Sequence, residues 1–209
     1  MTTTLPEPVK ERWRTAGRFA DVLQAEVKAR GHPFVARVVS WFNLCRVCQD
    51  LEEEMLLAAS PSSEDKQLHS ALLSTAIASG ESLLLESADA EALRPLKLTP
   101  QAMQAKLESL RITFEQWHTE LNPQRQAQCF GRSSVARSEQ LEAILRAQYE
   151  LEYAEPEALP HCLERLNAAL DEAIAETHLT RRELLSVLRD RYKEYKRAQL
   201  LAEARRRSV

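Results

Sequence analysis

The stretch PFVARVVSWFNLCRVCQDLEEEMLLAAS, residues 33–60, is the most apolar long segment of the chain. It contains no internal Gly or Pro, and its apolar residues surround most of a helix circumference. A surface helix carries only one apolar stripe, so this pattern predicts a central helix over about residues 34–59. The apolar members are Phe34, Val35, Val38, Val39, Trp41, Phe42, Leu44, Cys45, Val47, Cys48, Leu51 and Met55.

The composition favours an all-α fold. The 209 residues include only four Gly, which tight β-turns use freely, whereas the strong helix formers Leu, Ala, Glu and Arg are abundant. A chain of this length buries roughly 70% of its unfolded surface, so it needs no metal or disulfide to fold. We expect a bundle of about seven to eight helices around the central one.

Start and stop signals divide the rest of the chain into helices. A narrow stripe, consisting of Val9, Trp13, Ala16, Ala20, Leu23 and Val27, predicts a first helix that begins near Pro8 and is ended by Gly31-His32-Pro33. Small residues at Ala76, Ser79 and Gly80 would let another helix approach closely. Further helices are predicted after Ser62 or Ser63, at Thr99-Pro100, at Asn122-Pro123, after Ser133 or Ser134, near Leu159, and at a capping box formed by Thr180 and Glu183.

The same signals bear on domain organisation and location. No linker is long or polar enough to be flexible, so we expect residues 1–209 to form a single helical domain, with 1–90 and 99–209 as the alternative division. No run approaches the 18 or so apolar residues that cross a membrane, and the N-terminus lacks a signal-peptide core. We therefore expect a cytoplasmic protein that does not enter membranes.

The net charge of −3 hides an uneven distribution. Residues 48–91 carry one basic and ten acidic residues, net −9, whereas residues 181–209 carry ten basic and four acidic residues, net +6. Such asymmetry concerns partners rather than fold. The acidic run Glu52, Glu53 and Glu54 spans a wide arc of the central helix, so part of it is expected to face solvent and to offer a docking patch for a basic protein partner.

Two short motifs suggest chemistry, but their context favours packing. Cys45 and Cys48 form a CxxC in the middle of an apolar helix, away from the helix N-terminus that would activate a thiol. Glu115 and His118 form one ExxH, whereas di-iron bundles use two. A metal or redox four-helix protein would require these residues to converge with further ligands. We predict no catalytic residue, no metal and no cofactor, and we expect the four cysteines of the chain to be free thiols that pack as small apolar residues.

The last predicted helix is strongly basic, with Tyr192 and Tyr195 between its cations. With the preceding helix it has the outline of a helix-turn-helix, in which Arg181 and Arg182 would begin the recognition helix. The turn has no Gly where His178 stands, and interspersed acids dilute the charge. The candidate nucleic-acid contacts are Arg181, Arg182, Arg189, Arg191, Lys193, Lys196, Arg197, Arg205, Arg206 and Arg207.

These observations favour a non-enzymatic helical protein that acts through protein–protein interaction, such as an adaptor, an assembly factor or a regulator, or through homo-oligomerisation. The alternative is a DNA- or RNA-binding protein that uses residues 181–207. The sequence contains no Gly-rich phosphate loop and no GxSxG motif, so nothing in it points to an enzyme.

Overall fold

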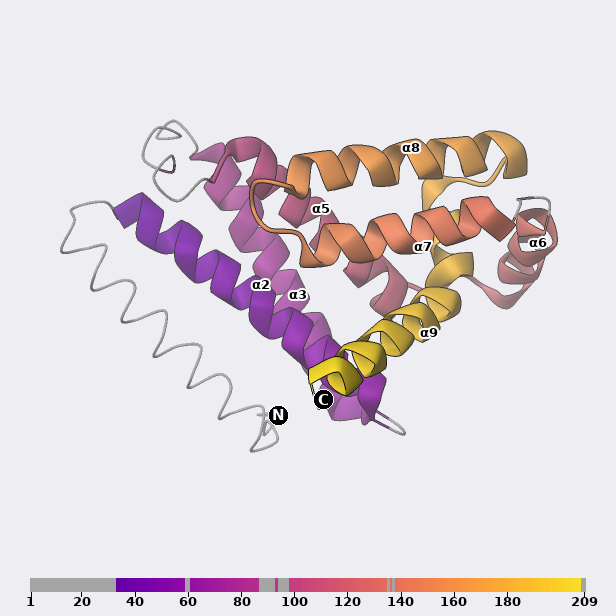
Figure 1. Ribbon diagram of the computed structural model, residues 1–209, viewed down its shortest axis with the longest axis horizontal. Helices are drawn as coiled ribbons and strands as arrows, with labels where there is room; N and C mark the ends of the chain where they lie inside the picture. Colours follow the sequence, from indigo (N-terminus) through magenta and orange to yellow (C-terminus); the bar gives the residue numbers. More distant parts are fainter. Residues whose placement is uncertain are drawn as a thin grey trace. The chain divides into compact units, whose positions relative to one another are not determined.

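The computed structural model describes residues 33–58, 61–86, 93, 98–134, 136 and 138–207. This part of the chain forms seven α-helices and no strand, so the all-α prediction is confirmed (Figure 1). The first helix, predicted from Pro8, lies outside the described residues. The helices are α2 (Pro33–Leu57), α3 (Ser63–Leu85), α5 (Pro100–His118), α6 (Pro123–Ser133), α7 (Ser138–Tyr153), α8 (Leu159–Thr177) and α9 (Arg181–Arg207).

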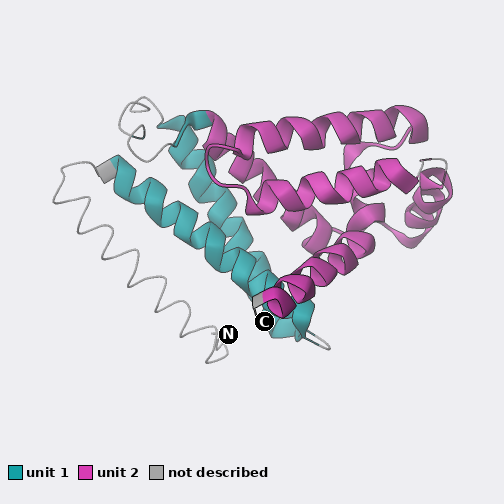
Figure 2. Cartoon of the chain, in the orientation of Figure 1, with its two compact units in different colours: residues 1–100 teal, residues 101–209 magenta. Residues whose placement is uncertain are grey.

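The chain divides into two compact units, Met1–Pro100 and Gln101–Val209 (Figure 2). The described helices of unit 1 are α2 and α3, and unit 2 contains α5 to α9. The sequence-based alternative boundary, between residues 90 and 99, lies close to this division.

Unit 1 is built on the predicted central helix. In α2 the side chains of Val38, Trp41, Cys45 and Cys48 are buried, and α2 packs along α3. The helix α3 begins at the predicted cap, because Ser62 Oγ accepts a hydrogen bond from the Asp65 N–H at 3.0 Å. The Asp65 carboxylate in turn accepts one from the Ser62 N–H at 3.1 Å, which completes a capping box.

A close approach fixes the spacing of α2 and α3. The Trp41 indole lies against Gly80, where a Cβ would come within 2.7 Å of the ring. The indole Nε1–H donates a hydrogen bond to the Ala76 carbonyl oxygen at 2.7 Å. The predicted close contact at the small residues of α3 is therefore present, and Trp41 is the side chain that uses it.

By length and composition, α3 is apolar enough to cross a membrane, although the core helix of a soluble protein passes the same test. Of its most apolar window, 39% is buried within the molecule. The cytoplasmic location expected from the sequence stays a prediction.

Unit 2 is centred on the pair α7 and α8, against which α9 also packs. In α8 the side chains of Leu159, Leu166, Leu170 and Ala173 are buried. The helix α9 is surrounded at its start, because all six residues 183–188 are buried. A helix in this position contributes to the core rather than to one surface alone.

Most helix starts in unit 2 agree with the sequence. Asn122 caps α6 through its Oδ1, which accepts from the Arg125 N–H at 2.8 Å. At α9 the Thr180 N–H donates to the Glu183 carboxylate at 2.9 Å, and the Glu183 N–H donates to Thr180 Oγ1 at 3.3 Å. The predicted capping box at residues 180–183 is thus confirmed.

The predicted start of α7 was wrong by about one turn. Ser133 is the last residue of α6, Ser134 is its C-cap, and α7 begins at Ser138. The Ser133 hydroxyl donates to the Phe130 carbonyl at 2.9 Å, and the Ser134 hydroxyl donates to the Gly131 carbonyl at 2.7 Å. Both side chains therefore satisfy carbonyls at the end of α6 instead of capping the next helix.

Between α8 and α9 the chain turns at His178, which has φ 54° and ψ 27°. This left-handed conformation terminates many helices and usually belongs to Gly. The His178 N–H donates to the Ile174 carbonyl oxygen at 2.9 Å, so the turn keeps its capping hydrogen bond.

Candidate functional site

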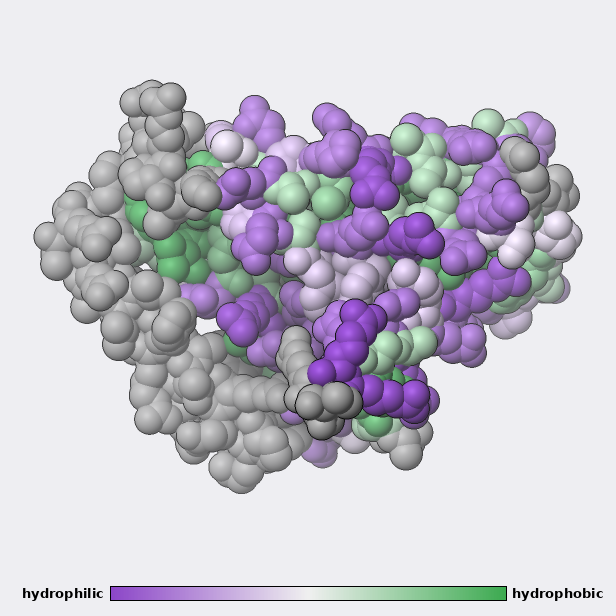
Figure 3. Space-filling view, viewed as in Figure 1, coloured by the Kyte–Doolittle hydropathy of each residue, from purple (hydrophilic) through white to green (hydrophobic). Residues whose placement is uncertain are grey.

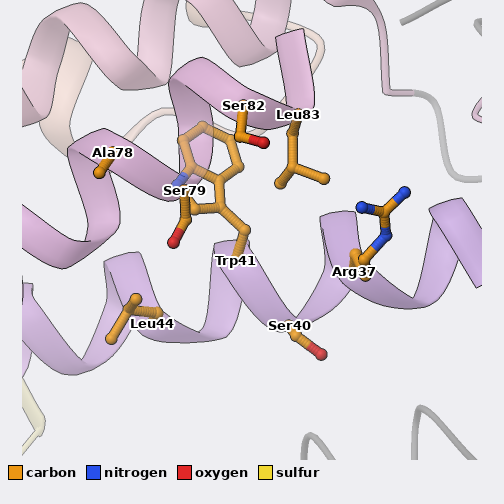
Figure 4. A pocket seen from close by; sticks show the side chains of 8 residues that line it. All are labelled: Arg37, Ser40, Trp41, Leu44, Ala78, Ser79, Ser82 and Leu83. Carbon is orange, nitrogen blue, oxygen red and sulfur yellow. The ribbon is translucent and has the colours of Figure 1, made fainter. Parts of the chain in front are cut away.

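A groove with a volume of about 540 Å³ lies between α2 and α3 in the described part of unit 1 (Figure 4). Its floor contains Trp41 and Leu83, which are 2% and 5% exposed. The groove exists because small residues of α3 face α2 at this level. The complete lining is Arg37, Ser40, Trp41, Leu44, Ala78, Ser79, Ser82 and Leu83.

One ion pair lies at the rim of this groove. The Arg37 guanidinium donates from Nη1 to Glu86 Oε1 at 3.0 Å and also contacts Oε2 through Nη2. The hydrogen bond from Arg37 lowers the pKa of the Glu86 carboxyl below its usual value. Both side chains are largely exposed, so the pair adds little to stability and instead leaves the rim electrically neutral.

The exposed side of α3 near the groove carries mostly small or uncharged side chains. The hydroxyls of Ser74 and Thr75 donate to the carbonyls of Ser70 and Ala71, at 2.8 Å and 2.9 Å. Their hydrogens are therefore directed at the helix itself and not at a partner. From residue 71 onward, the exposed residues of α3 are Ala71, Ser74, Thr75, Ala78, Glu81, Ser82 and Leu85, the last of which is 90% exposed.

The described part of unit 1 is acidic. Within residues 33–58 and 61–86, eight acidic and three basic residues give a net charge of −5. The predicted docking patch on α2 is only partly at the surface, since Glu52 is 2% exposed, Glu53 is half-buried and Glu54 is exposed. Burial removes Glu52 from any surface that a partner could touch.

Unit 2 contains a buried polar cluster centred on Glu152, near the C-terminal end of α7. Its carboxylate accepts a hydrogen bond from the Tyr192 hydroxyl at 2.5 Å and pairs with the Lys196 ammonium. The Lys106 ammonium donates to the Glu152 carbonyl oxygen at 3.0 Å. The cluster therefore joins α5, α7 and α9 at one residue.

The positive charges in this cluster compensate the buried carboxylate of Glu152. A carboxylate at a helix C-terminus is disfavoured by the helix dipole, and a buried charge requires a partner. Lys106 and Lys196 supply positive charge at that end of α7, and Lys196 also lies 5.4 Å from the Tyr153 ring centroid. Since the Lys196 side chain is 0% exposed, this group has a structural position rather than access to a substrate.

A second buried polar contact joins α5 and α7. Gln116 and Gln148 exchange two amide hydrogen bonds, from Gln116 Nε2 to Gln148 Oε1 at 3.1 Å and in the reverse direction at 2.6 Å. Both side chains are almost fully buried, at 2% and 4% exposed. Each amide thus satisfies a hydrogen-bonding group of the other inside the core.

The basic residues predicted to bind nucleic acid do not form one surface. Lys196 is buried against Glu152, and the Lys193 ammonium lies 3.6 Å from the Trp117 ring centroid. Arg181 is paired with Glu108 at 3.1 Å and with Asn167 at 2.7 Å. Arg189 is 18% exposed and lies 3.5 Å from the Asp190 carboxylate. The exposed members are Arg182, Arg191, Arg197, Arg205 and Arg206, and Figure 3 shows strongly hydrophilic side chains at the end of α9. The Arg207 side chain lies outside the described part.

The start of α9 is bound into unit 2 by a further ion pair. The Arg125 guanidinium of α6 contacts the Glu183 carboxylate of the capping box. The pKa of Glu183 lies below its usual value because the Thr180 backbone N–H, and then Arg125, donate hydrogen bonds to the carboxylate. The N-terminal turn that a recognition helix would present is therefore held by internal contacts.

The CxxC and ExxH motifs contribute side chains to packing. Cys45, Cys48, Cys129 and Cys162 are buried thiols, as predicted, and burial raises the pKa of Cys129 and of Cys162. His118 lies on Phe114, with ring centroids 5.5 Å apart. Burial, and then the charge of Lys193, lower the pKa of His118 to about 4. Among the described residues, no group of three or more His, Cys, Asp or Glu side chains could hold a metal.

The sequence analysis missed the buried Glu152–Lys196 pair and the α2–α3 groove, although the sequence contains a signal for each. Glu152 continues the buried α7 stripe, four residues after Gln148, and Lys196 follows the buried Tyr192 by four residues. Charged residues at such stripe positions indicate a buried pair. The small, uncharged side chains at exposed positions of α3 beside the groove, such as Ala78 and Ser82, were the sequence signal for it.

Comparisons with protein-family models, with curated proteins and with solved structures find no match to this chain.

Proposed function

We propose that the chain is a protein-interaction module whose α2–α3 groove binds an amphipathic helix of a partner protein. The observation that supports this is the groove itself, with its apolar floor of Trp41 and Leu83 and its wall of small residues. Helix-in-groove binding relies on apolar anchors repeated along one face of the partner. Small wall residues such as Ala78 and Ser82 leave room for its backbone.

The charge of unit 1 defines the partner further. The described residues of this unit carry a net charge of −5, so a helix with basic residues outside its apolar stripe would be attracted and correctly oriented. The neutral Arg37–Glu86 pair at the rim adds no competing charge. The partner that fits is thus a basic amphipathic helix.

Nucleic-acid binding through residues 181–207 is the second candidate. It draws support from the exposed Arg182, Arg191, Arg197, Arg205 and Arg206. Against it, Lys196 is buried and Arg181 is paired with Glu108, so fewer cations are available than the sequence suggests. If the protein bound nucleic acid, Arg205→Glu/Arg206→Glu would weaken retention of a labelled DNA duplex at low salt, where phosphate contacts are strongest.

The groove is tested with a synthetic peptide of about 20 residues, with Leu at alternating spacings of three and four and Lys at most other positions. Binding is followed by fluorescence anisotropy. We expect roughly micromolar affinity, and a loss of about tenfold or more for Ala78→Arg, which places a long charged side chain at the rim. Gln67→Arg is the matched control, because it adds the same charge at another exposed position of α3. Equal losses in both variants would show that the peptide senses net charge and not the groove.

A further inference from the structure

We propose that the α2–α3 groove of one molecule binds the C-terminal end of α9 from a second copy of this chain, in a head-to-tail contact. The inference rests on the proposed function, since it names the basic amphipathic helix that the groove binds. The contact uses two different surfaces, one from each copy, and both consist of described residues.

The end of α9 extends beyond the core of unit 2. Lys196 is the last buried side chain of this helix, and none of the residues 197–206 is buried. These residues form almost three turns of helix, about 15 Å long. A helical segment that buries no side chain gains little stability from packing, so a partner that covers it would stabilise it.

One side of this segment is held to the rest of unit 2, and the opposite side is open. The Tyr149 hydroxyl of α7 donates a hydrogen bond to the Glu203 carboxylate at 2.9 Å. Leu201 lies two residues before Glu203, which is about 200° around the helix, so it faces away from the side that contacts α7. Its side chain is 43% exposed and is therefore accessible to another molecule.

The open side is a short basic amphipathic surface, which we call the α9 end face. Leu201 lies at its centre, and Arg197 and Arg205 lie one turn before and one turn after it. Within residues 197–206, three basic residues and one acidic residue give a net charge of +2. Glu194 is exposed on the same side about two turns earlier, so the basic surface is limited to the end of the helix. The members of the α9 end face, all exposed, are Arg197, Ala198, Leu201, Ala204 and Arg205.

The groove is complementary to this face in shape and in charge. Its floor is apolar at Trp41 and Leu83, and small residues such as Ala78 and Ser82 form its α3 wall (Figure 4). Its volume of about 540 Å³ leaves room for Leu201 together with the small alanines beside it. The described part of unit 1 carries a net charge of −5, opposite in sign to that of the α9 end face.

Because the two surfaces differ, the contact between copies is heterologous. Each copy offers both surfaces, so a pair of copies can bind further copies unless it closes on itself. Three turns of helix bury much less surface than the roughly 1,600 Å² of a standard interface, and we therefore expect dissociation constants in the micromolar range.

Sedimentation velocity of the full chain, over a range of micromolar concentrations, measures this association. Leu201→Gln removes the apolar anchor of the α9 end face, and Ala78→Arg places a cation in the wall of the groove. We expect each variant to raise the dissociation constant by about tenfold or more. The matched controls are Phe130→Gln, which removes another exposed apolar side chain of unit 2, and Gln67→Arg on α3; both should associate as the parent does.

Mixing the two weakened variants gives the sharper test. The Leu201→Gln chain keeps an intact groove, and the Ala78→Arg chain keeps an intact α9 end face. An equimolar mixture should therefore form a one-to-one dimer, which cannot grow because its remaining two surfaces are both altered. The inference is overturned if this mixture stays monomeric, or if either variant associates by itself as strongly as the parent does.

The synthetic basic peptide separates this inference from the function on which it rests. A saturating concentration of the peptide should shift the parent chain towards monomer, because both ligands compete for one groove. If the peptide binds the groove but the parent chain is monomeric at every concentration, the head-to-tail contact is wrong and the groove function stands. If the peptide does not bind the Leu201→Gln chain, whose groove is intact, the groove function itself is wrong and the inference falls with it.

Discussion

Replacing Gly80 by Ala should destabilise unit 1, although Ala is the better helix former. The added Cβ would lie 2.7 Å from Trp41 Cζ2, 2.8 Å from Cε2 and 3.0 Å from Nε1. Real Cβ contacts are essentially never this short, so the indole has to move. It is 2% exposed, and its movement would stretch or break the hydrogen bond to the Ala76 carbonyl oxygen.

The magnitude follows from three contributions. Overpacking a well-filled site costs about 1–3 kcal/mol. Weakening the buried indole hydrogen bond adds about 1 kcal/mol. The higher helix propensity of Ala offsets roughly 1 kcal/mol of this total. We therefore expect Gly80→Ala to lower the free energy of unfolding by about 1–3 kcal/mol.

Urea unfolding followed by far-UV circular dichroism measures this change. Gly131→Ala in α6 is the control, since no atom lies within 4 Å of the new Cβ and the substitution should stabilise by up to about 1 kcal/mol. In a Trp41→Phe background, where a smaller phenyl ring replaces the indole that the new Cβ would meet, Gly80→Ala should lose most of its cost. If Gly80→Ala were neutral, or equally costly with Phe at position 41, the contact would not limit the packing of α2 on α3.

Three further predictions concern unit 2. His178→Gly should raise the free energy of unfolding by about 1 kcal/mol in urea denaturation, because Gly adopts the left-handed conformation without strain; an unchanged midpoint would argue against strain at this turn. Lys196→Met should cost roughly 3–5 kcal/mol, since it leaves the buried Glu152 carboxylate without its cation, and adding Glu152→Gln should restore part of the loss if the buried charge is the cause. Because the pKa of His118 falls to about 4 in the folded state, the unfolded state binds the proton first, and stability should drop as the pH is lowered from 6.5 towards 4. This loss of stability should be smaller than about 3 kcal/mol, because His118 is only half-buried beside Lys193. Thermal unfolding measured across this pH range should show the loss in the parent chain and not in His118→Gln.

Local rules predicted most of the helix starts in the described part of the chain. Ser62, Asn122 and Thr180 act as the predicted caps because the signal is contained within four residues. Ser133 and Ser134 misled the prediction because a hydroxyl can bond either to the helix before it or to the helix after it. Which one it serves depends on where the previous helix ends.

The candidate sites depended on contacts that no local pattern contains. Lys196 looks like part of a basic surface in the sequence, and only the folded chain places it against Glu152, which is 44 residues away. The sequence showed small residues at Ala76 and Gly80, but the partner side chain, Trp41, lies on another helix. Long-range pairing of this kind decides which cations and which apolar residues remain accessible.

The reciprocal amide pair of Gln116 and Gln148 has a consequence for sequence variation. Replacing one Gln by Leu would leave the other amide buried without its partner, at a cost of about 1–3 kcal/mol, whereas replacing both by Leu could be nearly neutral. Evolution should therefore treat the two positions as one. Relatives of this chain are expected to keep both glutamines or to lose both, and such covariation would by itself reveal that α5 lies against α7.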